Sequence, residues 1–71
     1  MQDYHKILGE NIRAKRTALG ISQEKLGLEI GIDRTYISGI ERGIRNPSLD
    51  VICKIASVLT VMPATLLQPS E

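Results

Sequence analysis

The sequence predicts an all-α domain built from five short helices. Residues that start and stop helices recur along the whole chain, and apolar residues fall at helical spacing between them. No segment alternates apolar and polar residues as a half-buried strand does. With 71 residues and no internal repeat, the chain is predicted to be a single domain over residues 1–71.

Capping residues and glycines bound the predicted helices. Ser22, Asp33 and Ser48 are expected N-caps, because their side-chain oxygens can accept the free amides of a first helical turn. A glycine follows each of the first three helices, and Pro63 suits the first turn of the last. The predicted helices are Tyr4–Leu19, the segment between Ser22 and Gly31, the segment between Asp33 and Gly43, Leu49 to about Thr60, and Ala64–Leu67.

The core must be aliphatic, because the sequence contains no Trp and no Phe. Apolar residues at helical spacing mark the side of each helix that is expected to face this core. They are Leu8, Ile12 and Leu19 in the first helix, Leu26 and Ile30 in the second, Ile37 and Ile40 in the third, and Leu49, Ile52, Ala56 and Leu59 in the fourth. Cys53 is expected to be a small buried apolar residue beside them.

Composition argues against several classes of protein. His5 and Cys53, the single histidine and cysteine, cannot supply four ligands for a structural zinc, so we expect no metal and no cofactor. No Ser/His/Asp set or glycine-rich phosphate loop indicates an enzyme. Without a membrane span or signal peptide, the expected compartment is the cytoplasm. The net charge of +1 does not by itself indicate a nucleic-acid partner. Any prediction of nucleic-acid binding must therefore rest on where the charged residues lie.

The second and third predicted helices are joined by a very short connection, Gly31 and Ile32. Helices that cross this closely need small residues at the crossing, and Gly27 and Gly31 supply them. The segment at about residues 22–42 therefore matches a helix-turn-helix, a unit whose second helix enters the major groove of DNA.

The stretch GISQEKLGLEIGIDRTYISGIERG at 20–43, followed by RNPSL at 45–49, resembles the phage-repressor-like (Cro/repressor, XRE-type) helix-turn-helix family. The likeness covers about residues 8–67, and DRTYISGIER at 33–42 resembles the controller proteins of restriction–modification systems. The resemblance implies a compact five-helix, lambda-repressor-like DNA-binding domain. Gly27 departs from the family, which usually has Ala at this position.

The predicted third helix has a polar side opposite Ile37 and Ile40, at roughly 100° per residue. Thr35, Ser38, Gly39 and Arg42 lie on that side, with Arg34 on its flank. Arg34 can offer a two-pronged donor to a guanine edge, and Thr35 can offer a hydroxyl to a base and a methyl to thymine. Gly39 is expected to leave the floor of the groove open, so that recognition concentrates at the start of the helix.

Polar residues around this helix are candidates for phosphate contacts, as cations and amide donors bind phosphate. They are Gln23, Arg42, Arg45 and Asn46. Two compatible interpretations stay open for Tyr36: a partly buried ring that supports Ile40, or a ring that lies along the DNA. The predicted DNA-binding set is Gln23, Arg34, Thr35, Tyr36, Ser38, Arg42, Arg45 and Asn46.

Glu41 would repel phosphate at the end of a DNA-facing helix unless a cation neutralised it. The family resemblance implies that Arg16, near the end of the first helix, is this cation. We expect the Arg16–Glu41 pair to be structural and to orient the first helix against the third, rather than Arg16 to bind DNA.

The predicted fourth helix carries a second apolar stripe, Val51, Ile55 and Val58, beside its core-facing side. An exposed apolar stripe favours an isologous dimer through helices at about 48–67. In the alternative interpretation, the fifth helix folds back and covers the stripe itself. The predicted dimer interface is Val51, Ile55, Val58, Met62, Leu66 and Leu67.

Together these features predict a sequence-specific, autoregulatory transcriptional regulator that binds a palindromic double-stranded DNA operator as a homodimer. RNA polymerase is a further expected partner if the protein activates from an adjacent site, whereas no membrane and no small-molecule ligand are expected. The controller protein of a restriction–modification system is the favoured role. A phage-type repressor or an antitoxin-like autoregulator is the alternative within the class, and an adaptor that binds protein with the same fold is the alternative outside it.

Overall fold

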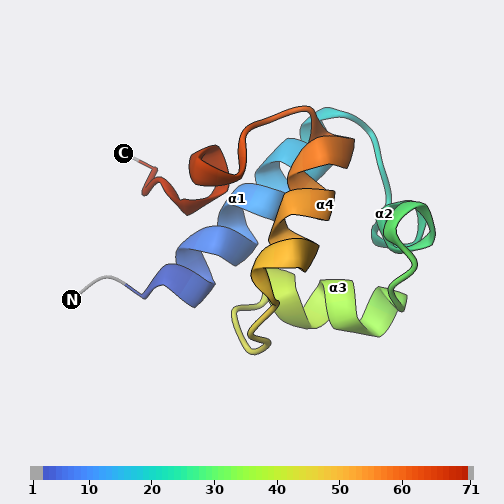
Figure 1. Cartoon of the computed structure of the whole chain (residues 1–71), viewed down its shortest axis with the longest axis horizontal. Coiled ribbons are helices and arrows are strands. Elements are labelled where there is room, and N and C mark those ends of the chain that lie inside the picture. The colour runs from blue at the N-terminus through green and yellow to red at the C-terminus, as the bar shows by residue number, and fades with distance from the viewer. Residues whose placement is uncertain (1–2, 71) are drawn as a thin grey trace.

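The computed structural model describes residues 3–70, and within them the all-α prediction is confirmed (Figure 1). The elements are α1 (Tyr4–Ala18), α2 (Gln23–Ile30), α3 (Arg34–Glu41), α4 (Leu49–Leu59) and the short helix η1 (Pro63–Leu67). The last element is a 3₁₀-helix rather than an α-helix, as is usual for a segment of so few residues. No helix within the described residues is long and apolar enough to cross a bilayer.

The three predicted N-caps are confirmed. The side-chain oxygens of Ser22, Asp33 and Ser48 accept first-turn amides of α2, α3 and α4 at 3.0, 2.7 and 3.2 Å. Asp3 caps α1 in the same way, a role that the sequence analysis did not assign. Thr60, expected within the fourth helix, instead ends it with a φ of 58°. Local hydrogen-bonding chemistry therefore sets the helix starts, as expected for side chains that act within one turn.

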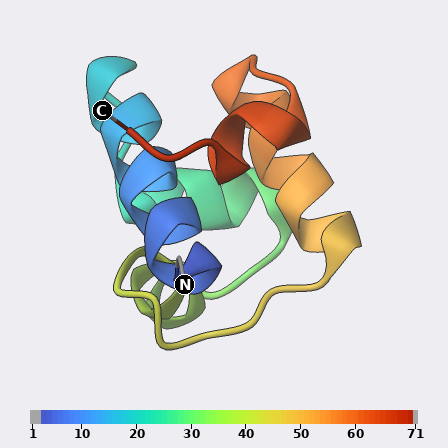
Figure 2. The same cartoon turned by 90° about the vertical axis from the view of Figure 1, so that its left-hand side faces the viewer.

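The core lies where the four α-helices and η1 meet, and Figure 2 shows η1 between α1 and α4. Its buried apolar residues are Leu8, Ile12, Leu26, Ile37, Ile40, Ile55, Ala56, Leu59 and Leu66. Three core predictions were wrong, because Leu19, Leu49 and Cys53 are exposed. Leu19 caps the end of α1, where the chain leaves the core. Leu49 and Cys53 lie to one side of the buried face of α4, which centres on Ile55 and Leu59.

The predicted dimer interface is also partly wrong, because α4 is turned so that a different side of it faces the core than expected. Ile55 and Leu66 have no exposed surface and belong to the domain's own core, so they cannot contact a second copy. Val51 and Val58 are half-buried and pack against that core. The stripe is thus covered by the domain itself, since both α2 and the C-terminal segment that contains η1 pack against α4. Asn11 holds that segment in place, since its Nδ2 donates to the carbonyls of Leu66 and Gln68 at 2.9 and 2.8 Å.

Gly9 sets the distance between α1 and the end of α3. A Cβ at this position would lie 2.4 Å from the carbonyl oxygen of Ile40 and 2.5 Å from that of Glu41. Because both obstructing atoms are backbone, no side-chain rotation could relieve the contact. The close approach of α1 to α3 thus requires a residue without a side chain at position 9.

We expect Gly9→Ala to lower the free energy of unfolding, measured by urea denaturation. The cost of overpacking against backbone, about 1–3 kcal/mol, should exceed the gain of roughly 1 kcal/mol in helix propensity. Gly39→Ala is the matched control, since the nearest atoms to its Cβ would all belong to the Arg45 side chain rather than to backbone. Equal stability of the two variants would contradict this account of Gly9.

Candidate DNA-binding surface

A tight crossing of α2 and α3 presents one side of α3 to solvent, along an edge of the molecule (Figure 1). Leu26 of α2 and Ile37 of α3 are fully buried and fill the angle between the helices. The amide of Ile32 donates to the carbonyl of Gly27 at 2.8 Å, and Gly31 closes the turn with a φ of 73°. A Cβ on Gly27 would lie 2.3 Å from the carbonyl oxygen of Ile32, so the glycine keeps this crossing close.

The structure gathers the predicted DNA-binding residues around α3 and the loop that follows it. Arg34, Thr35, Arg42, Arg45 and Asn46 are exposed, whereas Gln23, Tyr36 and Ser38 are half-buried. Arg34 lies beside a shallow hollow between the first turns of α2 and α3, which is lined by Arg16, Ser22, Gln23, Glu24 and Arg34. The start of α3 is therefore the part of the helix whose side chains are most accessible to a duplex.

Asp33 and Thr35 form a polar unit at this accessible start. Asp33 Oδ1 accepts hydrogen bonds from both the backbone amide and the hydroxyl of Thr35. These bonds to Thr35 lower the pKa of the Asp33 carboxyl, so it is ionised at neutral pH. With its proton directed toward Asp33, the Thr35 hydroxyl presents its oxygen as an acceptor for a donor on a base edge.

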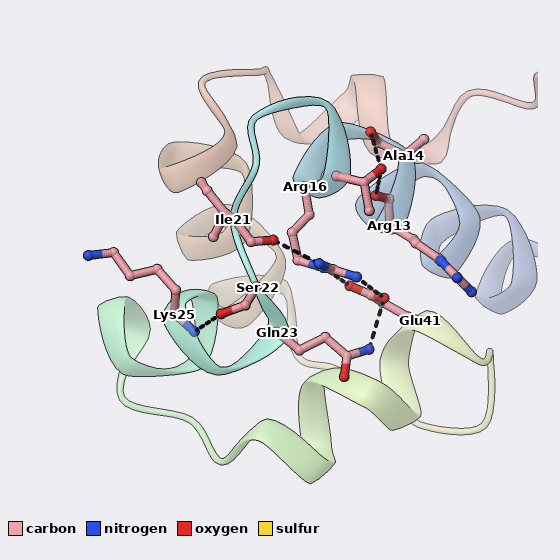
Figure 3. A network of polar contacts seen from close by, with 9 residues as sticks. Arg13, Ala14, Arg16, Ile21, Ser22, Gln23, Lys25 and Glu41 are labelled. Atoms are coloured by element: carbon pink, nitrogen blue, oxygen red, sulfur yellow. Dashed lines mark hydrogen bonds and ion pairs between the residues drawn. The ribbon is translucent and has the colours of Figure 1, made fainter.

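Glu41 lies at the centre of a buried network that ties three helices together (Figure 3). Arg16 donates to Glu41 through two nitrogens, Nε at 2.6 Å and a terminal nitrogen at 3.0 Å, and its third nitrogen donates to the carbonyl of Ile21 at 2.7 Å. The side chains of Arg16 and Glu41 are 10% and 3% exposed. The hydrogen bond to Glu41 raises the pKa of the Arg16 guanidinium, which therefore stays charged despite its burial.

The structure thus brings Arg16 and Glu41 together with the geometry of a structural pair. It also assigns Gln23 a partner that the sequence analysis missed, since Gln23 Nε2 donates to Glu41 Oε1 at 3.1 Å. Gln23 was expected to reach the DNA, but its amide nitrogen points inward to this network. No local signal predicts the contact, because Gln23 and Glu41 are 18 residues apart and meet only through the crossing of α2 and α3.

Arg45 lies across the outer surface of α3. The chain turns back after α3, where the amide of Ile44 donates to the carbonyl of Gly39 at 3.0 Å. The Arg45 guanidinium then lies 5.8 Å from the centre of the Tyr36 ring. Gly39 is buried beneath the Arg45 side chain, so the prediction that Gly39 leaves an open groove floor was wrong. Tyr36 packs partly against the core, in line with the first of its two interpretations.

Comparison with known proteins shows which family the chain belongs to. A model of the helix-turn-helix family matches residues 12–66. The chain belongs to this family. It is a helix-turn-helix transcriptional regulator, and the resemblance to controller proteins is confirmed.

Two curated relatives are control proteins. C.BamHI of Bacillus amyloliquefaciens is 50% identical over 62 residues, which are 86% of this chain and 76% of that protein. C.SmaI of Serratia marcescens is 38% identical over 65 residues, covering 92% and 77% of the two chains. Among solved structures, the restriction–modification controller protein C.AhdI of Aeromonas hydrophila matches with a TM-score of 0.83 and 45% identity, over 87% of this chain and 94% of that one.

A further helix-turn-helix regulator is similar in structure. SinR, described as a master regulator for biofilm formation and solved in complex with DNA, matches with a TM-score of 0.80 and 35% identity. The match covers 86% of this chain and 98% of the SinR chain. The arrangement of α2 and α3 described above thus recurs in a helix-turn-helix protein whose DNA complex has been solved.

We expect Arg16→Met to destabilise the domain by about 3–5 kcal/mol in urea unfolding, because it leaves the Glu41 carboxylate buried without its cation. Replacing both partners, Arg16→Met with Glu41→Leu, should restore most of this loss, since no unpaired buried charge remains. A single variant that unfolds completely and a double variant that folds would agree with this account. A double variant less stable than Arg16→Met would contradict it.

Proposed function

We propose that the protein binds an operator through α3 and controls transcription from it. The observation that carries this proposal is the exposed start of α3, with Arg34 and Thr35 accessible on a helix that Leu26, Ile37 and the Glu41 network hold rigidly in place. A rigid helix with an exposed polar side suits the major groove, which admits one α-helix. Membership of the helix-turn-helix family also supports the docking of α3 in the major groove.

Roles for the individual side chains follow from where they lie. Arg34 and Thr35, at the accessible end of α3, are the proposed contacts to base edges, with Ser38 and Tyr36 lying along the groove. The exposed side chains of Arg42, Arg45 and Asn46 beyond the helix are the proposed phosphate contacts. Gln23 supports this surface from beneath through Glu41.

We propose that two copies bind together, through the exposed apolar side of α4 and η1. Leu49, Met62 and Leu67 are 70%, 72% and 37% exposed, which is costly for a soluble monomer. Ile52 and Leu67 also line one small, mainly apolar hollow beside α1. A two-fold axis through this face would present both α3 helices to successive major grooves, about 34–36 Å apart. The operator should then be an imperfect palindrome.

The likeness to C.BamHI, C.SmaI and C.AhdI supports the role of a controller protein that regulates its own promoter in a restriction–modification system. Repression by occluding the promoter is the minimum mechanism, and activation would require contact with RNA polymerase from an adjacent site. A neighbouring gene for an endonuclease or a methyltransferase would support this role. A toxin gene or a phage early operon at that place would instead support an antitoxin-like or phage-type regulator.

Affinity measurements on the DNA upstream of its own gene test the proposed roles of the arginines. Arg34→Ala should cost about 1–3 kcal/mol on the operator and little on random DNA, because a base contact carries sequence information. Arg45→Ala should weaken binding to both DNAs and lower the slope of log affinity against log salt by about one. Equal losses on both DNAs for Arg34→Ala would remove Arg34 from base recognition, and no binding by the parent protein would refute the proposed function.

Charge substitutions on the exposed apolar face test the dimer. Leu49→Glu and Leu67→Glu should yield folded monomers in sedimentation velocity, since burying an unpaired charge between copies is unfavourable. Both should also lose tight operator binding, because one domain makes too few contacts. Leu28→Glu, at a position 76% exposed on α2, is the control for oligomeric state and should remain a dimer. A folded Leu49→Glu or Leu67→Glu monomer with parental operator affinity would overturn the dimer mechanism.

A further inference from the structure

Gly39 differs from the other glycines of the chain in what surrounds it. The sequence has six glycines. Three of them, Gly20, Gly31 and Gly43, have positive φ angles, and a Cβ on Gly9 or Gly27 would strike backbone. At Gly39 the backbone is helical, and the nearest atoms to an added Cβ are all in the Arg45 side chain: Cγ at 2.5 Å, Nε at 3.3 Å and Cδ at 3.4 Å. The backbone of α3 therefore does not require glycine at this position.

Arg45 occupies the space that a side chain at position 39 would fill. Its methylene groups cross α3 over Gly39, and its guanidinium lies over the Tyr36 ring at 5.8 Å from the ring centre. The turn that returns the chain to this point is closed by the hydrogen bond from the Ile44 amide to the Gly39 carbonyl. The backbone carbonyl at position 39 thus closes the turn that brings Arg45 back to the helix, and the lack of a side chain there makes room for the Arg45 side chain.

We propose that Gly39 is a positioning residue for DNA binding. Because Gly39 has no side chain, the Arg45 side chain can pack against α3 with its guanidinium over Tyr36. This proposal rests on the proposed function, in which α3 meets DNA. Glycine is an unfavourable residue in a helix interior, and Arg45 supplies the reason for its presence. A long arginine that is already ordered loses fewer rotamers on binding, so its contact with DNA is stronger than that of a freely moving side chain.

A measurement without DNA tests whether Arg45 packs over Gly39 and Tyr36 in the free protein. In the parent protein, the methylene protons of Arg45 should show NMR shifts caused by the Tyr36 ring, and Gly39→Ala should move them to the values of an unstructured arginine. Tyr36→Leu should do the same, because it removes the ring. Arg45 protons at unstructured values in the parent protein would overturn the proposal and leave the proposed DNA-binding function standing.

A cycle of variants tests the consequence for DNA. Gly39→Ala should be at least as stable as the parent, yet its operator Kd should rise on the order of tenfold, as for Arg45→Ala. The double variant should bind no more weakly than Arg45→Ala alone, because both changes remove the same contact. The control Ser57→Ala, an exposed position on α4, should leave the Kd unchanged while raising helix propensity.

The remaining outcomes of this cycle are equally decisive. A further loss of affinity in the double variant would mean that the added methyl obstructs DNA directly, which would overturn the role of Gly39 as a positioning residue for Arg45. Unchanged affinity in Gly39→Ala, beside a clear loss in Arg45→Ala, would also overturn it, while supporting Arg45 as a DNA contact. Unchanged affinity in Arg45→Ala would refute the role of both residues, and an absence of operator binding by the parent would refute the proposed function itself.

Discussion

The burial of one carboxylate, that of Glu41, is the constraint on which the exposed surface of α3 depends. A buried charge is tolerated only when it is paired and hydrogen-bonded, and here Arg16 and Gln23 together supply three donors. These donors come from α1 and α2, whereas the acceptor ends α3. The three helices must therefore keep one relative arrangement for the charge to be satisfied, and that arrangement exposes the other side of α3.

Glycines complete this arrangement where helices come too close for side chains. Gly9 brings α1 against the last carbonyls of α3, and Gly27 brings α2 against the turn that leads into α3. Close backbone approach and the Glu41 network act on the same helix from two sides. These contacts hold α3 from behind, whereas Arg45 lies across its outer surface and leaves the start of the helix exposed.

Several features of the site followed from the sequence because they depend on neighbours within one turn or on short spacing. The caps at Ser22, Asp33 and Ser48 and the exposure of Arg34 and Thr35 belong to this group. The features that the sequence analysis missed join residues far apart along the chain or across a loop. Gln23 turns inward because α2 crosses α3, and Gly39 is covered because the loop after α3 folds back over it.

The fourth helix marks the boundary between what sequence and tertiary structure decide. By itself, the sequence determined that this segment is helical, that it begins after Ser48 and that more than one of its sides is apolar. Only the tertiary structure decided which apolar side faces inward: Ile55 is buried, and Leu49 is exposed. The physical reason is that helical periodicity is a property of local backbone geometry, whereas the rotation of a helix about its axis is set by packing against its neighbours, here α1, α2 and η1.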